Sequence, residues 1–418
     1  MKADSVKIAD GVYWVGALDW DARDFHGFAV PGMTYNSYLL FGEEKVALID
    51  NVDFGFYPEL RARIDDAFAK EGKDEVKIDV LIQNHIEYDH LGSLPELIGE
   101  FPDIEVYCTQ NAANNIPLQI PALEGQEFNV MVTGDTLDIG GKSFTFVNAA
   151  MLHWPDSNFT LYNEEGILFS NDAFGQHVCL SKRFDKDVDP GYLALHAKRF
   201  YANLVSLSSR LVVAKVKEMT EKGYLDNLTM IAPCHGQIWT EPQTIVDLYA
   251  KWATGAADEK ITVIFDTMHH ATQKMAHAIM EGIMSEGVEA KLCYLKYDAE
   301  SSVLAEVLDS KAVIFGAPTM MNNPYPPVQK MLGYLNCVKF GNCGVKKKAV
   351  VFSSSGWAGG AVKKMNEALK DAKFDVLEED AIEAKFYPKE DILDQCYDLG
   401  KKIANMVKEE YFFNFYFF

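Results

Sequence analysis

The sequence predicts an α/β protein with two domains in series, and three observations support this fold class. The first half of the chain mixes short apolar runs with a few helical patterns, whereas residues after 260 alternate strictly between strand and helix patterns. Strict alternation is typical of a doubly wound parallel sheet. The 418 residues also suffice for two or three domains of ordinary size. We expect domains over residues 1–253 and 260–410, joined near the segment WATGAADEK.

Seven short apolar runs in the first domain are predicted strands, because they are bounded by turn residues and rich in branched side chains. They are Tyr35–Leu40, Val46–Asp50, Val80–Gln83, Ile104–Cys108, Ser143–Asn148, Ile167–Ser170 and Met230–Ala232. Helices are expected at Tyr57–Lys70 and Leu94–Glu100, with a longer helical region from about Gly191 to Gly223. Acidic residues or histidines follow several strands, where α/β enzymes often place functional side chains.

The second domain is predicted to contain four strands that alternate with four helices. The strands are expected at 261–265, 291–297, 312–317 and 348–354, and the helices at 272–285, 301–308, 326–335 and 359–371. In a doubly wound sheet, ligands bind beyond the carboxyl ends of the strands. The loops after these strands are therefore candidate binding loops.

Charge and composition exclude several classes of function. Acidic residues outnumber basic ones 61 to 39, a net charge of −22, so we expect no nucleic-acid partner. The N-terminus MKADSVKIADGVYW lacks the apolar core of a signal peptide, and no run approaches the roughly 20 apolar residues of a membrane span. The aromatic tail YFFNFYFF, residues 411–418, either docks on a neighbouring surface or is an added remnant.

The seven cysteines are scattered and form no C-x-x-C pair. This excludes a disulfide framework, a structural zinc ribbon and an appended rubredoxin-type iron domain. We therefore expect a cytoplasmic protein.

The segment QNHIEYDH, residues 83–90, concentrates side chains that can bind metal ions. In an extended segment alternate residues share a face, so His85, Glu87 and Asp89 are expected to point the same way. His90 follows where the chain turns into the next helix. One short loop can thus serve two adjacent metals.

Three further candidate ligands lie downstream, namely His153 in LHWPDS, Asp172 in NDAFG and His235 in PCHGQ. A single carboxylate between two cations is a natural bridge, which favours Asp172 for that role. The whole set contains four imidazoles, three carboxylates and no thiolate, and such sets suit iron or manganese as well as zinc. The third carboxylate, Glu87, stabilises higher oxidation states and so favours iron.

The motif around Glu87 resembles a known family. Hydrolases of the metallo-β-lactamase fold usually carry H-x-H-x-D-H, and this chain has Glu87 in place of the second histidine. Together with DWDARDFHGF, TYNSYLL, LHWPDS and NDAFGQH, this pattern resembles the flavodiiron proteins, or A-type flavoproteins, over nearly the whole chain. The resemblance implies a metallo-β-lactamase-like αββα sandwich followed by a flavodoxin-like doubly wound sheet.

The resemblance also implies which residues hold a non-haem diiron site. His85, Glu87 and His153 would hold one iron, and Asp89, His90 and His235 the other, with Asp172 as the bridge. His26 in RDFHGF and His177 in FGQH would be either hydrogen-bond donors to these ligands or purely structural residues.

Three loops of the second domain are expected to bind FMN. The first, DTMHHAT, presents a helix N-terminus to an anion, and it lacks both G-x-G-x-x-G and a Walker lysine, which favours a single phosphate. Pro318–Asn323 would line the flavin ring and Trp357 would stack on it, while Gly360 and neighbouring glycines let the backbone approach. The expected residues are Thr267, Met268, His269, His270, Ala271, Thr272, Pro318, Thr319, Met320, Asn322, Asn323, Ser354, Ser355, Gly356, Trp357 and Gly359. His269 and His270 either help to neutralise the phosphate or are exposed and inert.

These observations together predict a reductase. As in the family it resembles, FMN would pass electrons to two irons that reduce dioxygen to water, nitric oxide to nitrous oxide, or both. One alternative is a zinc-dependent hydrolase of the metallo-β-lactamase fold with an accessory flavodoxin domain, and Glu87 and the FMN loops argue against it. A second is an electron-carrying flavodoxin fused to a degenerate scaffold, and the complete ligand set argues against that.

The chain lacks C-x-x-C pairs, so its electron donor must be separate: a rubredoxin-like protein or a reduced deazaflavin coenzyme. The resemblance further implies a head-to-tail homodimer, or a tetramer of two such dimers, in which the FMN of one chain lies beside the irons of the other.

Overall fold

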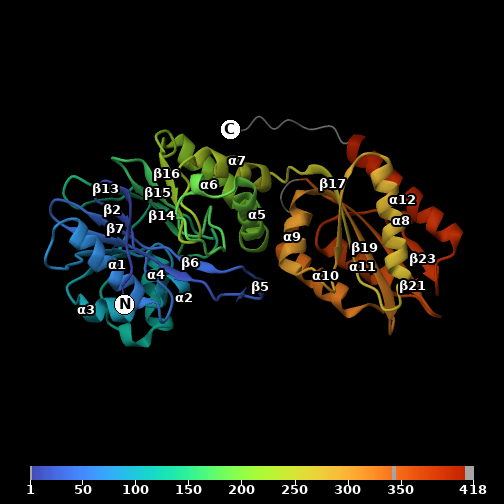
Figure 1. The fold of residues 1–418 in the computed structure, drawn as a ribbon, viewed down its shortest axis with the longest axis horizontal. Coiled ribbons are helices and arrows are strands. Elements are labelled where there is room, and N and C mark those ends of the chain that lie inside the picture. The colour runs from blue at the N-terminus through green and yellow to red at the C-terminus, as the bar shows by residue number, and fades with distance from the viewer. Residues whose placement is uncertain (1, 341–344, 410–418) are drawn as a thin grey trace. The chain divides into compact units, whose positions relative to one another are not determined.

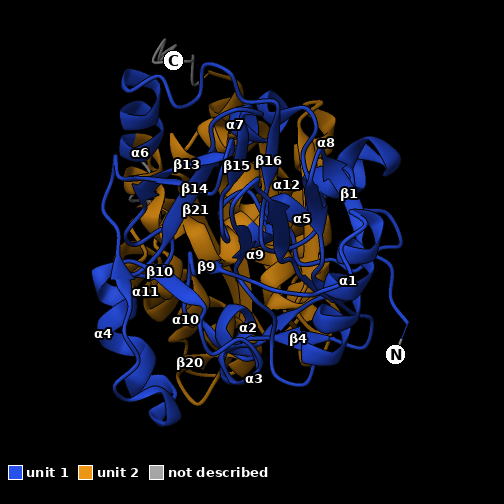
Figure 2. Ribbon diagram, turned by 90° about the vertical axis from the view of Figure 1, so that its left-hand side faces the viewer, with its two compact units in different colours: residues 1–200, 214–248 blue, residues 201–213, 249–418 orange. Residues whose placement is uncertain are grey.

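A computed structural model describes residues 2–340 and 345–409 of the protein (Figure 1). The chain forms two compact units, residues 1–200 with 214–248 and residues 201–213 with 249–418 (Figure 2). The predicted division between residues 253 and 260 stays a prediction, and the aromatic tail 411–418 lies outside the described residues. Within the described ranges, no helix is long and apolar enough to span a membrane.

The first unit contains two sheets. The larger has the order β1-β2-β7-β8-β9-β10-β11, with bounds Val6–Ala9, Val12–Trp14, Tyr38–Phe41, Val46–Ile49, Val80–Ile82, Glu105–Cys108 and Asn129–Val130. The smaller has the order β12-β13-β14-β15-β16, with bounds Thr136–Asp138, Ser143–Asn148, Asn158–Tyr162, Ile167–Phe169 and Met230–Ala232. Two short hairpin-like pairs, β3 (Ala17–Asp19) with β6 (Met33–Tyr35) and β4 (Asp24–Phe25) with β5 (Phe28–Ala29), complete the unit.

Successive side chains along a strand point to opposite faces of the sheet, which explains how one sheet contributes to two cores. On β7, Tyr38 and Leu40 join the core between the sheets, whereas Leu39 and Phe41 join the core under the helices. That second core is covered by α1 (Tyr57–Lys70), α3 (Leu94–Glu100) and α4 (Gln110–Gln119). On the far side, α6 (Ser209–Glu221) lies near the smaller sheet, where Lys215 donates to the carbonyl of Asn148 at 2.7 Å. The expected αββα sandwich is confirmed.

Two sequence predictions in this unit were wrong in detail. The predicted strand Tyr35–Leu40 is two strands, β6 and β7, which pair with different neighbours. The break falls at Asn36, whose side-chain amide accepts from Trp14 Nε1 at 2.8 Å and whose backbone N–H donates to the Cys234 carbonyl at 2.7 Å. Residues about 200 positions away therefore interrupt the strand.

The predicted helical region 191–223 is also interrupted. It consists of α5 (Pro190–Phe200), a π-helical turn (Tyr201–Val205), a 3₁₀ turn and α6. The Ser206 hydroxyl donates to the Ala202 carbonyl at 2.8 Å, which competes with regular helix bonds. The aromatic rings of Tyr249 and Trp252 pack on Tyr201, with centroids 4.9 and 5.3 Å away. All three residues belong to the second unit, so these contacts assign the π-helical turn to the second unit and not to the first.

The second unit is a parallel sheet covered on both faces. The order is β18-β17-β19-β21-β22, with bounds Glu289–Tyr294, Asp258–Phe265, Ser310–Met320, Lys348–Ser355 and Asp375–Val376, and β23 (Ile382–Lys385) also pairs with β21. Helices α8 (Ala271–Ser285) and α12 (Glu390–Glu409) cover one face, and α9 (Glu300–Asp309), α10 (Pro326–Val338) and α11 (Ala361–Asp371) lie toward the other (Figure 1). This strand order confirms the predicted doubly wound sheet.

Helices α8 and α12 approach closely because glycines face each other. A Cβ on Gly400 would lie 2.2 Å from the Ile279 carbonyl oxygen, and one on Gly282 would lie 2.0 Å from that of Tyr397. Gly333, within α10, would meet nothing within 4 Å.

We predict opposite effects for Gly400→Ala and Gly333→Ala. At Gly400, forced separation of two helices costs about 1–3 kcal/mol, which outweighs the roughly 1 kcal/mol gained in helix propensity. At Gly333 an added Cβ meets no neighbouring atom, so only the gain in helix propensity remains. Calorimetry should show a lower Tm for the second unit with Gly400→Ala and a higher one with Gly333→Ala. Equal shifts of the same sign would contradict the close helix contact.

Candidate metal and flavin sites

The loop after β9 carries four of the candidate ligands in two conformations. Glu87 lies in extended backbone, with φ −65° and ψ 151°, and His85 lies in the irregular segment just before it. Asp89 and His90 lie instead in the short helix α2 (Tyr88–Leu91). The prediction that Asp89 continues the extended segment was therefore wrong, because the helix begins one residue after Glu87. This change of conformation turns Asp89 and His90 toward a different neighbour.

The other candidates reach the same place because of the sheet topology. The strand pairs β8–β9 and β15–β16 are parallel, so the segments after them share an edge. Asp172 and His235 each follow their strand by three residues, and His153 lies in the loop between β13 and β14. Backbone bonds join the two sheets there, from Asn158 N to the Asn84 carbonyl at 2.9 Å and from Asn36 N to the Cys234 carbonyl.

The two carboxylate oxygens of Asp172 face two separate groups of ligands. Oδ2 lies 3.4 Å from Nε2 of both His85 and His153. Oδ1 lies 3.4 Å from Nε2 of both His90 and His235. The structure therefore brings Asp172 between the two halves of the predicted set.

The remaining two carboxylates lie one in each group. Glu87 Oε2 lies 3.5 Å from His85 Nε2 and 3.4 Å from His153 Nε2. Asp89 Oδ2 lies 3.1 Å from His235 Nε2, and Asp89 Oδ1 lies 3.4 Å from Nε2 of His90. All seven predicted ligands thus converge around Asp172.

This convergence has the properties of a metal site. His85, Glu87, His153 and Asp172 offer ligand atoms that all lie within 4.8 Å of one another. Within the described residues, His85 Nε2, Asp172 Oδ2 and both oxygens of Asp89 are buried and have no hydrogen-bond partner. Buried polar atoms normally have partners, so such a concentration is typical of atoms that bind cations. The donor set fits two metal ions.

Mutual attraction between imidazoles and carboxylates shifts their pKa values. Burial would lower the pKa of His153, but Asp172 and Glu87 raise it to about 9. Burial would also lower the pKa of His235, but Asp172 and Asp89 raise it to about 10. The imidazoles hold the pKa of Asp172 well below its usual range, although burial acts against them. Protons on His153 and His235 would thus offset part of the carboxylate charge, and metal ions would replace those protons.

An outer layer of hydrogen bonds orients the ligands. His85 Nδ1 lies 2.8 Å from Asp156 Oδ2, which also accepts from the Ile86 N–H at 2.9 Å. His235 Nδ1 lies 2.6 Å from the Thr34 carbonyl. Such partners fix the ring orientation and leave Nε2 for a metal. Sequence reasoning missed Asp156, although it lies in the LHWPDS segment that supplied His153.

The two histidines predicted near the ligands have different surroundings. His26 Nε2 lies 2.6 Å from Glu87 Oε1. His177 is buried, its ring packs between Phe25 and Phe200, and burial lowers its pKa to about 3. His177 is therefore neutral in an apolar setting. Whether either residue supports catalysis stays a prediction.

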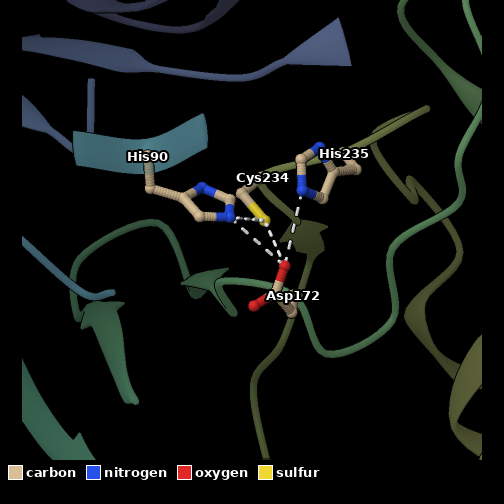
Figure 3. A group of neighbouring side chains, drawn as sticks. All are labelled: His90, Asp172, Cys234 and His235. Atoms are coloured by element: carbon tan, nitrogen blue, oxygen red, sulfur yellow. Dashed lines mark hydrogen bonds and ion pairs between the residues drawn. The ribbon is translucent and has the colours of Figure 1, made fainter. Parts of the chain in front are cut away.

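Cys234 is a further neighbour that sequence reasoning missed (Figure 3). Its Sγ belongs to a second group of ligand atoms within 4.8 Å of one another, with His90, Asp172 and His235. A cysteine directly before a histidine has no diagnostic spacing, so no motif indicated it. The predicted ligand set contains no thiolate, and that stays a prediction.

The three predicted flavin loops meet at one edge of the second unit. The first follows β17, and the other two begin within the last residues of β19 and β21; these three strands are adjacent and parallel. The prediction that Pro318–Met320 lie in a loop was wrong, because β19 continues to Met320 and pairs there with the short strand β20 (Asn323–Pro324). Thr272 Oγ1 lies 3.0 Å from Ser354 Oγ, which joins the first loop to the third. A Cβ on Gly360 would lie 2.7 Å from the Asn322 carbonyl, so the second and third loops also touch. His269 and His270 are exposed, and Trp357 is 85% exposed.

This edge fits a ligand with one phosphate. Helix α8 begins after His270, which adopts a left-handed φ of 64° and gives the helix no side-chain cap. Thr267 Oγ1 is buried and lacks a hydrogen-bond partner among the described residues. An uncapped N-terminus of a 15-residue helix and a free hydroxyl together suit an anion.

Comparisons with known proteins match both parts of the chain. A family model described as ODP family beta lactamase matches residues 33–236, and one described as Flavodoxin matches residues 263–400. A flavodiiron protein from Giardia intestinalis has a solved structure with 31% identity and a TM-score of 0.89, covering 97% of both chains.

The chain belongs to the flavodiiron proteins. It is 51% identical over 407 residues to a coenzyme F420H(2) oxidase from Methanocaldococcus jannaschii, covering 96% of this chain and 97% of that one. It is 40% identical over 408 residues to a nitric oxide reductase from Moorella thermoacetica, covering 97% and 99%.

Membership in the flavodiiron family settles several predictions. The chain is an oxidoreductase, its cofactors are FMN and a non-haem diiron centre, and it reduces dioxygen, nitric oxide or both. The zinc hydrolase alternative is not favoured. The individual residues that bind each cofactor stay predictions.

We predict that Asp156→Ala weakens one metal site, whereas Asp172→Ala weakens both. Among the predicted ligands, Asp156 bonds to the side chain of His85 alone, and loss of such a partner typically lowers metal affinity 10- to 100-fold. Asp172 faces both groups. Iron retained after a chelator challenge should approach about one ion per chain for the first variant and none for the second. FMN content and Asp138→Ala, an exposed carboxylate, serve as controls. Full retention of both irons by Asp172→Ala would remove it from the bridge.

Proposed function

We propose that this flavodiiron protein oxidises a reduced deazaflavin coenzyme and passes the electrons to dioxygen, with water as product. Two reduced coenzymes each give two electrons and two protons, which convert one O₂ into two molecules of water. The 51% identity to a coenzyme F420H(2) oxidase over almost the whole of both chains carries this proposal. Reduction of nitric oxide is the second candidate, supported by 40% identity to a nitric oxide reductase.

In this proposal the first unit holds the diiron centre. His85, Glu87 and His153 would bind one iron, Asp89, His90 and His235 the other, and Asp172 both. When bound, the two irons supply the electrons and the binding position for a small oxidising gas. Three carboxylates offset most of the charge of two divalent cations, so the pair is stable at a buried site.

The surrounding residues keep this site suited to a small neutral gas. Phe25, Phe200 and the neutral ring of His177 form an apolar wall beside His235. Apolar walls exclude bulk water, so electrons reach the gas and side reactions are suppressed. His26 holds the outer oxygen of Glu87, which fixes the orientation of that ligand.

The second unit, over residues 260–410, would bind FMN at the edge described above. The phosphate would lie at the N-terminus of α8, with hydroxyls of Thr267 and Thr272 as donors. The loop Pro318–Asn323 and the exposed ring of Trp357 would contact the flavin. The exposed His269 would lie near the phosphate.

We predict that the purified protein contains about two irons and one non-covalent FMN per chain, and that F420H₂ is its best donor. Elemental analysis and chromatography of the acid-released flavin test the content. Oxidation rates with F420H₂ or reduced rubredoxin, each with O₂ or NO, test the function. We expect the fastest turnover with F420H₂ and O₂, without hydrogen peroxide. Turnover with reduced rubredoxin but not with F420H₂ would contradict the proposed electron donor. Preferential reduction of NO over O₂ would favour the second candidate function.

We further propose a cytoplasmic, head-to-tail homodimer in which electrons cross from one chain to the other. Six cysteines of the described residues are free thiols, which suits a reducing compartment. A two-fold arrangement repeats every contact, so it would create two identical FMN–diiron pairs at once. Two such dimers would make a tetramer.

A mixed dimer tests the crossing. One chain carries His85→Ala with Asp172→Ala, and a differently tagged partner carries Thr267→Glu with Thr272→Glu. We expect about half of the normal activity, because one intact FMN faces one intact diiron centre. An inactive mixed dimer with the expected iron and FMN in its intact sites would refute transfer between chains.

A further inference from the structure

Cys234 is held rigidly beside the bridging carboxylate. Its backbone N–H donates to the Asn171 carbonyl at 3.0 Å, and its own carbonyl accepts from Asn36 N at 2.7 Å. The side chain is only 2% exposed. These two bonds fix its backbone between the segment that carries Asp172 and the break between β6 and β7, and burial leaves its side chain little freedom to turn away.

The thiol contacts only one of the two oxygens of Asp172. Cys234 Sγ lies 3.2 Å from Oδ1 and 3.8 Å from His90 Nε2 (Figure 3). Oδ1 is the oxygen that faces His90 and His235. Oδ2 faces His85 and His153, and it has no hydrogen-bond partner among the described residues. The carboxylate is therefore asymmetric before any metal binds.

We propose that Cys234 is a positioning residue that donates its S–H to Asp172 Oδ1 and so makes the two halves of the diiron centre unequal. A donated hydrogen bond withdraws electron density from Oδ1, which makes this oxygen a weaker donor to the iron held by His90 and His235. A weaker anionic donor favours the ferrous form, so this iron has the higher reduction potential and takes up an electron first. The inference rests on the proposed ligand set.

The geometry favours a donor over a metal ligand. Asp89, His90, His235 and Asp172 already offer this iron four nitrogen or oxygen atoms, and a thiolate would add a further buried negative charge. A thiol is a weak but adequate donor to a carboxylate, and partners of this kind tune metal sites throughout proteins.

The test compares Cys234→Ala, which removes the donor, with Cys234→Ser, which keeps a hydroxyl. Cys179→Ala is the control, since Cys179 is a buried thiol of the same unit whose charged neighbours are Arg183 and Asp19. Each holoenzyme is titrated with reductant under anaerobic conditions. Electron paramagnetic resonance follows the mixed-valent diiron form, and iron and FMN contents are measured alongside.

We expect Cys234→Ala to lower the potential at which the first iron is reduced. It should also narrow the range of potential over which the mixed-valent form exists. Cys234→Ser should restore most of the lost potential and most of that range, and Cys179→Ala should give the same values as the unchanged chain. Unshifted potentials in Cys234→Ala with full iron overturn the proposal. A thiolate-to-iron absorption band that both Cys234 variants lose also overturns it, in favour of a ligand role. Should Cys234→Ala lose its iron, Cys234→Ser must retain both irons and normal potentials, and otherwise the proposal fails. Absence of iron from the unchanged chain instead defeats the proposed diiron centre.

Discussion

The placement of Asp172 between two groups of imidazoles is the constraint on which the first unit depends. A carboxylate whose two oxygens each face two imidazole nitrogens at 3.4 Å requires one loop of the larger sheet, after β9, and three loops of the smaller sheet, after β13, β15 and β16, to meet at the same edge. Parallel pairing of β8 with β9, and of β15 with β16, provides this. The apolar core between the two sheets then holds them in fixed positions, so the packing that stabilises the fold also positions these side chains.

Holding three carboxylates and four imidazoles inside a protein is costly, and a layer of hydrogen-bonded polar groups reduces that cost. The Asp50 carboxylate accepts from the Asn84 N–H at 2.7 Å, and burial raises its pKa to about 6. Asn84 in turn bonds to Asn158 across the sheets. This network satisfies the backbone around the ligand loop. It leaves several inward-facing atoms of the predicted ligands without a hydrogen-bond partner among the described residues, and two metal ions would satisfy them.

The sequence predicted most of the site because its signals are local. Four ligands fall within six residues, and each of the others follows an apolar run closely. It could not predict the helical turn at Asp89, since Glu87 and Asp89 alternate as in a strand. It could not reveal the break at Asn36 either, because that break is set by hydrogen bonds to residues near 234. Asp156 and Cys234 were missed for the same reason, since their roles exist only once distant segments meet.

The difference between the two sites follows from what each must hold. Metal ions need several charged or imidazole ligands at short range, so the diiron site is buried, dense in titratable groups and visible as a motif. A flavin with a single phosphate is bound largely through backbone and apolar contacts, so its loops carry few specific side chains and are recognised mainly by position. At the flavin edge, burial of Thr267 and Thr272 and exposure of Trp357 separate a polar end from an apolar end. In the proposed arrangement that polarity would orient the cofactor, with its phosphate toward α8 and its ring toward the exposed Trp357.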